Sequence, residues 1–294
     1  MAEAEWDGSS KGSLLGYKIF VFCIRTFGLR ASYALLAFVT FYYFLFAWKS
    51  NKAAYSYFKN QLNYSTVKAV FSIYKSYYIF GQTLIDRLMV GSGKRDRFTY
   101  EFDGIENIRN AMKSGNGAVL ISAHVGNFEL SEYFFDDLGE EIVSHIVTTD
   151  QEKEQIKNFL KKLSLKSRLK YILIQDDMSH IYEINAALSN NELVCMTGDR
   201  YMPGSKYLEH EFLNDIARFP AGPFLLGSRL RVPVLFVYVM KEGLSHYHLY
   251  AREAKDFHRN EKELLKSFVE SITHILEKYP YQWFNYFNFW KKEE

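Results

Sequence analysis

The chain has 294 residues, 48% of them hydrophobic and 24% charged, which is enough to form one large domain or two small ones with a sizeable core. The formal net charge is only +2, with basic residues interleaved among acidic ones, and this argues against a nucleic-acid-binding protein. The two cysteines, Cys23 and Cys195, exclude a disulfide framework and a cysteine-based zinc site. An aromatic share of 17% suits a membrane interface or a greasy cleft, and equally a tyrosine-rich core.

The N-terminal part of the chain carries the strongest membrane signal. After a polar, acidic start over residues 1–12, apolar runs follow at residues 14–24 and 31–48. As a helix, the second run covers roughly 27 Å, slightly less than a hydrocarbon core. We therefore expect a hydrophobic membrane-anchoring helix here, with a buried core helix as the alternative. Basic residues flank the run on both sides and leave its orientation open.

The rest of the chain reads as helices and strands of a layered domain. Between residues 55 and 90, apolar residues recur at the spacing of a helix with a broad packing face. Expected strands cover residues 98–102, 118–122, 142–148, 170–174, 193–197, 233–240 and 247–252. Expected helices cover residues 105–113, 128–137, 151–165, 180–189, 224–229 and 261–278. This alternation predicts an α/β fold with a mainly parallel sheet flanked by helices.

The pattern contains no internal repeat and no linker rich in Pro, Gly or Ser. We therefore divide the chain into two parts. Residues 1–50 form a tail and membrane anchor, and residues 51–294 form an α/β domain whose N-terminal portion is helical.

The candidate catalytic residues lie just after the expected strand at residues 118–122. That continuous apolar run is typical of a buried parallel strand, and a short turn separates it from a helix with Asn127 as N-cap. His124 then lies at the carboxyl end of a central strand, where open α/β sheets bind ligands, and Glu129 lies in the first helical turn. A histidine can remove a hydroxyl proton at neutral pH, and a carboxylate on its other nitrogen fixes its tautomer. By spacing alone, such a pair is more often structural than catalytic.

The sequence Ser-Ala-His-Val-Gly-Asn-Phe-Glu at residues 122–129 resembles the H-x4-D/E motif of the lysophospholipid acyltransferase superfamily. Its Gly-Asn-aromatic-acid ending resembles the branch of bacterial lipid A late acyltransferases. Further segments resemble the same branch: a strand ending in an acid at 193–200, a P-x-G-P segment at 219–227 with its next strand at 231–234, and a closing P-x-Q-W-F…W element at 279–290. The likeness covers nearly the whole chain.

The resemblance implies an acyltransferase in which His124 is the general base and Glu129 its partner. The acyl donor it implies is a thioester of acyl carrier protein or of coenzyme A, and the chemistry needs no metal or other cofactor. The acceptor we expect is a hydroxyl or amine of an envelope lipid, first of all a lipid A-type glycolipid. The expected location is the bacterial inner membrane, with the catalytic domain on its cytoplasmic face.

Four further residues are expected to bind substrate: Asn127, Asp199, Arg200 and Gly222. Arg200 is expected either to hold an anionic group of the acceptor, such as a phosphate, or to brace the loop against Asp199 or Glu129. Many late acyltransferases have Asp-Gln where this chain has Asp199-Arg200, and this departure leaves the acceptor open. No E-G-T-R-like motif is present, which disfavours a glycerol-phosphate acceptor.

The sequence is also compatible with other functions. The acceptor could be a specialised one, such as an aryl-polyene pigment or an aminolipid. The chain could also be a catalytically silent, membrane-anchored lipid-binding protein, although the His124 and Glu129 pair argues against this. His246 and His248 share one face of an expected strand and could bind a metal, but no third ligand is evident and an exposed strand edge is favoured.

Overall fold

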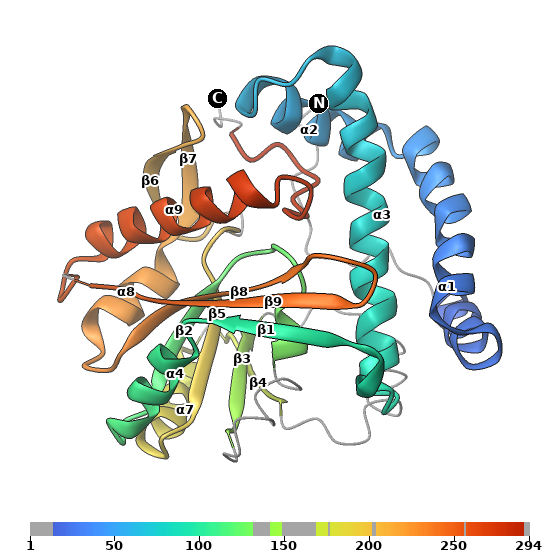
Figure 1. Ribbon diagram of the computed structural model, residues 1–294. Helices are drawn as coiled ribbons and strands as arrows, with labels where there is room; N and C mark the ends of the chain where they lie inside the picture. Colours follow the sequence, from blue (N-terminus) through green and yellow to red (C-terminus); the bar gives the residue numbers. More distant parts are fainter. Residues whose placement is uncertain are drawn as a thin grey trace.

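A seven-stranded sheet forms the centre of the protein (Figure 1). The computed structural model describes residues 14–131, 142–148, 169–175, 177–201, 204–255 and 257–290. The strand order is β1-β9-β8-β2-β5-β3-β4, and every neighbouring pair is parallel except the hairpin of β8 and β9. The strands are β1 (Thr99–Asp103), β2 (Ala118–Ser122), β3 (Ser144–Thr148), β4 (Leu169–Leu173), β5 (Leu193–Thr197), β8 (Val234–Lys241) and β9 (His246–Glu253). The predicted mainly parallel α/β sheet is confirmed.

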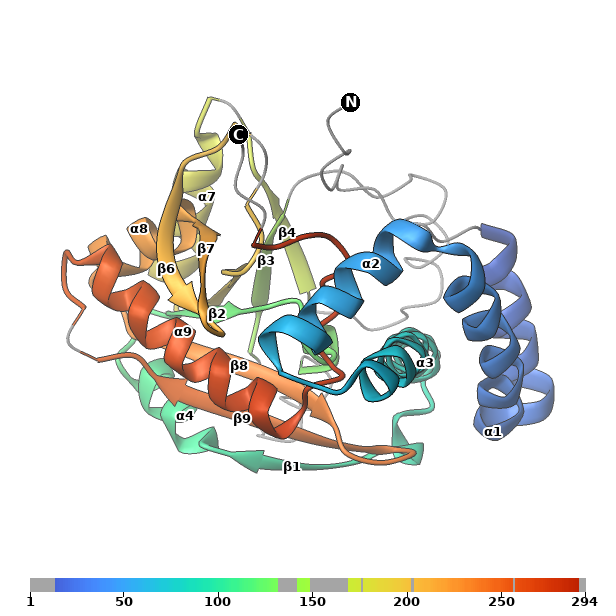
Figure 2. The same ribbon diagram turned by 90° about the horizontal axis from the view of Figure 1, so that it is seen from above.

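Helices cover both faces of the sheet and one side of the molecule. They are α1 (Leu14–Phe46), α2 (Trp48–Ser56), α3 (Thr66–Gly91), α4 (Ile105–Lys113), α7 (Ser179–Ser189), α8 (Ala221–Arg229) and α9 (Glu261–Lys278). Short helical turns are η1 (Tyr57–Gln61), η2 (Arg95–Arg97) and η3 (Phe128–Leu130). Helix α9 covers one face and α4 the other, while α1 and α3 run side by side at the edge of the molecule (Figures 1 and 2).

The central strand β2 shows why the sheet is buried on both faces. All five of its residues are buried, and alternate side chains point to opposite faces. Val119 and Ile121 pack in one hydrophobic core with residues of α7, α8 and α9. Ala118 and Leu120 pack in a second core with residues of α1, α3 and α4. The two cores hold β2 in place, and with it the loop that follows.

Helix α1 packs against the domain and also exposes a large apolar surface. It is kinked at Gly28, whose φ is 81° and ψ −174°. Tyr33 and Leu36 of α1 are buried, and the side chain of Leu36 lies against Gly81 of α3. By length and composition α1 could cross a membrane, a criterion that core helices of soluble proteins and signal sequences also meet.

A β-hairpin between β5 and α8 is absent from the expected elements. Its strands are β6 (Tyr207–Phe212) and β7 (Asp215–Pro220), which pair antiparallel. Its two turn residues, Leu213 and Asn214, both have positive φ, at 51° and 72°. Such turns normally carry Asn-Gly or Asp-Gly, so a leucine in the first position removes the sequence signal.

One expected helix begins differently from the prediction, and another lies outside the described residues. After Asn127 the structure has the short turn η3, and residues 132–141 are not among those described. The helix expected at residues 151–165 also falls outside the described part of the chain.

Candidate active site

The loop after β2 is fixed by backbone hydrogen bonds from two directions. The N–H of Gly126 donates to the carbonyl of Gln282 at 2.9 Å, and the N–H of Phe284 donates to the carbonyl of His124 at 2.9 Å. The N–H of Asn127 donates to the carbonyl of Val239 at 2.7 Å. At Gly126, φ is 57° and an added Cβ would lie 2.0 Å from that same carbonyl oxygen, so only glycine fits. The histidine therefore sits on a rigid support.

Neighbouring strands bring His124 and Asp199 together. Strands β2 and β5 are parallel partners, so their carboxyl ends lie at the same edge of the sheet. The Asp199 Oδ1 atom lies 2.7 Å from His124 Nδ1, and Oδ2 accepts the backbone N–H of His124 at 3.0 Å. The indole N–H of Trp283 also donates to Oδ2, at 3.0 Å. The carboxylate is fully buried, whereas the His124 side chain keeps 30% of its surface exposed, which leaves it open to a substrate.

The surroundings favour a neutral histidine beside an ionised aspartate. Burial lowers the pKa of His124 below its ordinary value of 6.5, the Arg200 guanidinium lowers it further, and Asp199 opposes both. Burial alone would raise the pKa of Asp199, but the charges of His124 and Arg200 and the Trp283 hydrogen bond outweigh it and hold that pKa at about 2. At neutral pH the imidazole can therefore accept a proton.

The carboxylate on His124 Nδ1 differs from the predicted one. Glu129 forms an ion pair with Arg87 of α3 instead, and both side chains are about one-third exposed. Glu129 lies on η3, and this turn packs against α3. Asp199 contacts Nδ1 of His124, whereas Glu129 contacts Arg87, and the role of Glu129 as the partner of His124 stays a prediction.

A model of the bacterial lipid A biosynthesis acyltransferase family matches residues 17–292. The chain belongs to this family. The match covers nearly the full length and includes the His124 loop, Asp199 and the closing C-terminal element. Membership implies an acyltransferase that acts on lipid A-type substrates, with a lipid acceptor and an acyl donor. The comparison with curated proteins gave no match.

The structure shows where two other predicted site residues, Asn127 and Gly222, lie. The Asn127 amide donates to the carbonyl of Thr83 at 2.9 Å and to the hydroxyl of Tyr247 at 3.4 Å, so it ties the loop to α3 and β9. It makes no side-chain cap on η3. Gly222 lies in the first turn of α8, where an added Cβ would meet no atom of the described residues within 4 Å. A substrate could approach the backbone there, and this role stays a prediction.

Arg200 reaches the C-terminal segment. Its Nη2 donates to the carbonyl of Phe284 at 2.6 Å, and its guanidinium lies 5.6 Å from the ring centre of Phe287. These contacts support the bracing role, with Phe284 as a partner in addition to the electrostatic interaction with Asp199. Binding of an anionic group by Arg200 stays a prediction.

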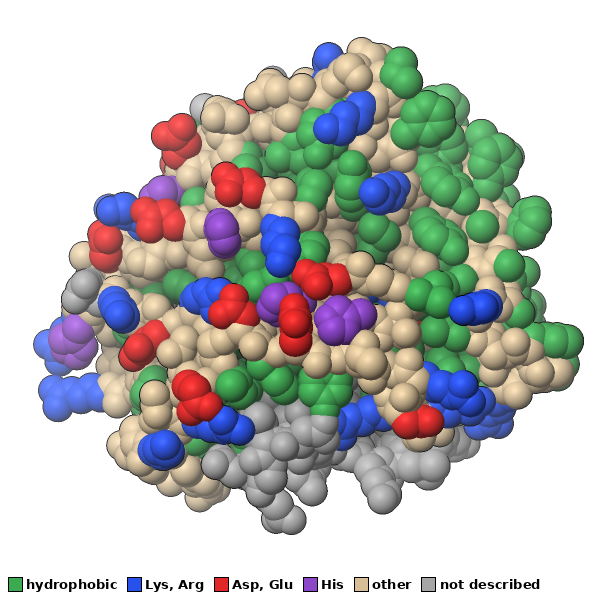
Figure 3. Space-filling view, in the orientation of Figure 1, with side chains coloured by type: hydrophobic (Ala, Val, Ile, Leu, Met, Phe, Trp, Pro, Cys, Tyr) green, Lys and Arg blue, Asp and Glu red, His purple; other side chains and the backbone are tan. Residues whose placement is uncertain are grey.

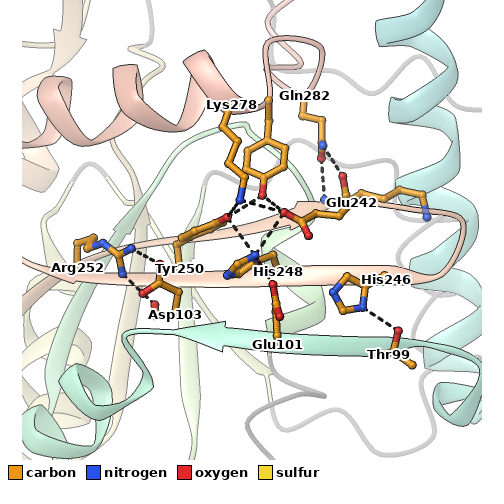
Figure 4. A network of polar contacts seen from close by, with 12 residues as sticks. Thr99, Glu101, Asp103, Glu242, His246, His248, Tyr250, Arg252, Lys278 and Gln282 are labelled. Carbon is orange, nitrogen blue, oxygen red and sulfur yellow. Dashed lines mark hydrogen bonds and ion pairs between the residues drawn. The ribbon is translucent and has the colours of Figure 1, made fainter.

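The C-terminal segment contributes residues to which sequence reasoning assigned no role. Trp283 forms a β-bridge with Val125, and its indole N–H donates to Asp199. The side-chain amide of Gln282 accepts from the backbone N–H of Lys241 at 2.9 Å and donates to its carbonyl at 2.7 Å (Figure 4). The P-x-Q-W-F motif was the available signal. The motif alone does not predict the contacts of this segment, because the sequence does not give the distance between the segment and the His124 loop.

Buried polar atoms without hydrogen-bond partners occur on the segments that build the site. Among the described residues these include the Ser122 hydroxyl, two positions before His124, and both amide atoms of Asn285, next to Phe284. Ser122 and Asn285 are 2% and 5% exposed. An unsatisfied buried polar group costs free energy, and Ser122 and Asn285 carry this cost on the two segments that hold His124 and Phe284.

His248 belongs to an ion-pair network away from this site. Its Nδ1 lies 2.8 Å from Glu101 and 3.3 Å from Glu242, and these three side chains could in principle hold a metal (Figure 4). Lys278 lies 3.2 Å from the same Glu242 oxygen, and Tyr279 also donates to it. The carboxylates are therefore paired within the protein, and nothing in the network calls for an ion.

Proposed function

We propose that this chain transfers a fatty acyl group from a thioester of acyl carrier protein or coenzyme A to a hydroxyl or amine of a lipid A-type glycolipid. The reaction takes place at the cytoplasmic face of the bacterial inner membrane. In this proposal His124 is the general base and Asp199 is the carboxylate that orients it. The observation that carries the proposal is the 2.7 Å contact between His124, whose side chain is 30% exposed, and the buried carboxylate of Asp199.

The geometry supports a single-displacement mechanism. Asp199 holds the proton of His124 on Nδ1, so Nε2 acts as the base. As the acceptor oxygen attacks the thioester carbonyl carbon, Nε2 takes the hydroxyl proton and a tetrahedral intermediate forms. Its collapse breaks the carbon–sulfur bond, and the imidazolium returns the proton to the leaving thiolate. The products are the acylated lipid and the free thiol, and no acyl-enzyme forms.

The test is acyl transfer by the purified, detergent-solubilised protein, with both donor thioesters and a lipid A precursor, read by mass spectrometry. We expect His124→Ala to lower the rate roughly 10²–10⁴-fold, the usual contribution of a general base. Asp199→Asn should be severely impaired as well, because the amide no longer stabilises the imidazolium. Turnover near that of the unaltered protein in folded His124→Ala would overturn the proposal.

Glu129→Gln is the matched control for Asp199→Asn. Each replaces one carboxylate by an amide of the same shape, and only Asp199 touches His124. We expect Glu129→Gln to retain more activity than Asp199→Asn. The reverse order would return the partner role to Glu129.

The alternative functions are separated by the same measurement. A catalytically silent lipid-binding protein would bind lipid and give no product with either donor. A specialised acceptor, such as an aryl-polyene pigment or an aminolipid, would leave lipid A precursors unmodified. Lipid mass spectrometry of a strain that lacks the gene would then reveal the unacylated acceptor.

A further inference from the structure

Trp283 lies at the back of the His–Asp pair. It is 3% exposed, and its indole N–H donates to Asp199 Oδ2 at 3.0 Å. Three aromatic rings fix its direction: its ring centroid lies 5.1 Å from that of Tyr57, 5.5 Å from that of Phe212 and 5.1 Å from that of Phe289. The donor is thus aimed at the carboxylate by packing that does not involve the substrate.

We propose that Trp283 is a positioning residue that fixes the carboxylate of Asp199 and keeps His124 neutral, and so ready to act as a base. This inference rests on the proposed role of His124. With Trp283 and the backbone of His124 both on Oδ2, the carboxylate cannot rotate, and Oδ1 is directed at Nδ1. The last segment of the chain thereby completes the site begun by β2 and β5.

The protonation state of His124 depends on the charges of its neighbours. An ionised carboxylate beside a histidine favours the imidazolium, and an imidazolium cannot act as a base. The indole N–H places a partial positive charge beside the pair, and this charge repels an imidazolium but not a neutral imidazole. Trp283 therefore opposes the effect of Asp199 on His124. Losing the indole N–H should raise the pKa of His124.

Other charged or titratable groups also lie near the His–Asp pair and influence its pKa values. Arg200 faces both His124 and Asp199, Tyr238 faces Asp199 from β8, and Tyr286 faces Arg200. Burial keeps the pKa of both tyrosines above their ordinary value, so they stay neutral. Of the neighbours named in this paragraph, Arg200 and Trp283 are the two that influence the pKa values of the His–Asp pair at neutral pH. Trp283→Phe removes the influence of Trp283 and leaves Arg200 in place.

Trp290 provides a matched control. Its ring centroid lies 5.6 Å from that of Trp283 in the same aromatic cluster, and its indole N–H also makes a 3.0 Å hydrogen bond, but to the carbonyl of Phe212. Trp290→Phe therefore removes the same ring system and an equally long hydrogen bond without touching Asp199. Any effect common to both variants reports on packing.

The experiment compares Trp283→Phe with Trp290→Phe in the full chain in detergent. Because the carboxylate of Asp199 can then turn away from Nδ1, we expect Trp283→Phe to lower kcat roughly 10- to 100-fold, a size typical of a lost hydrogen bond to a charged group, with little change in KM. The acid limb of the kcat/KM profile should move to higher pH. Trp290→Phe should leave that limb in place. An acid limb at the same pH in the two variants would overturn the inference.

A second readout does not depend on activity. In protein labelled at histidine, the NMR titration of the His124 ring, assigned by its loss in His124→Ala, should give a higher pKa in Trp283→Phe. An unchanged or lower pKa would contradict the inference even if transfer is measured, whereas failure of transfer with a raised pKa would count only against the proposed function. If Trp283→Phe does not fold, naphthylalanine at position 283 keeps the bicyclic ring and lacks the N–H.

Discussion

His124 has to be neutral to act as a base, yet it touches an ionised carboxylate. The structure resolves this through burial and the guanidinium of Arg200, which together hold the pKa of His124 below 6.5. Asp199 is ionised at neutral pH, because its pKa is held at about 2. The pair is therefore arranged for proton acceptance near neutral pH rather than for storage of a positive charge.

This arrangement predicts the pH dependence of activity. A base works only when deprotonated, so kcat/KM should rise with pH through the pKa of His124 and level off above it. Because that pKa is lowered, the acid limb should lie below pH 6.5. A pH–rate profile of the unaltered protein checks this, and an acid limb above pH 6.5 would contradict it.

Arg200 offers a second prediction at the scale of single residues. Its Nη2 holds the carbonyl of Phe284, whose own N–H holds the carbonyl of His124. We expect Arg200→Lys to lower kcat while leaving the acceptor KM little changed, because a point charge cannot keep the planar guanidinium contacts. Steady-state kinetics with varied acceptor separates the two roles. A raised KM with normal kcat would instead establish that Arg200 binds the substrate.

At the scale of elements, a buried ion pair ties the N-terminal helices to the sheet. Asp86 of α3 and Lys241 of β8 are 2.7 Å apart, with side chains 0% and 4% exposed. Tyr33 of α1 and Tyr247 of β9 also donate to Asp86. The Tyr247 hydroxyl in turn accepts from the amide of Asn127, and so α1, α3 and the His124 loop share one support.

Breaking this pair should unfold the protein more readily. Asp86→Ala leaves Lys241 buried without its carboxylate, and the free energy of unfolding should fall by about 3–5 kcal/mol. Lys266→Ala, which breaks an exposed pair with Glu263 on α9, should cost less than about 1 kcal/mol. Denaturant unfolding of both variants in detergent measures the difference. Equal losses would show that the buried pair is not what joins α3 to the sheet.

At the scale of the whole molecule, the apolar surface lies on one side. Large hydrophobic side chains of α1, the start of α2 and the start of α3 are exposed, and Figure 3 shows this patch on the side formed by α1 and α3. Its most exposed members include Phe38, Trp48 and Phe71, at 77%, 78% and 71%. Soluble monomers rarely leave such a contiguous surface uncovered, so a membrane is the expected environment.

We therefore predict that the protein sediments with membranes and needs detergent for release. Replacing Phe38, Phe41 and Trp48 by lysine should weaken vesicle binding strongly, since burying each such side chain contributes about 1.5–3 kcal/mol. Tyr182→Lys is the control, because Tyr182 is 80% exposed on α7, outside this patch. Vesicle flotation measures binding. Full-length protein that stays soluble at low and high salt alike would make α1 a core helix.

The sequence by itself determined most of the elements. The bounds of β2, β5, α4 and α9 match the predicted ranges 118–122, 193–197, 105–113 and 261–278. Apolar runs and helical spacing are local properties, so a stretch of chain carries them without its neighbours. The hairpin of β6 and β7 escaped prediction for a local reason too, because Leu213 occupies a turn position where positive φ usually marks glycine or asparagine.

Only the tertiary structure shows which acid contacts His124. Glu129 is five positions away and was the natural choice from spacing, whereas Asp199 is 75 positions away and reaches Nδ1 because β2 and β5 are paired. Trp283 is still farther from His124 in the sequence, and it reaches Asp199 because the C-terminal segment pairs with the His124 loop. Contacts between distant residues depend on strand order and packing, and a single sequence carries no direct record of either.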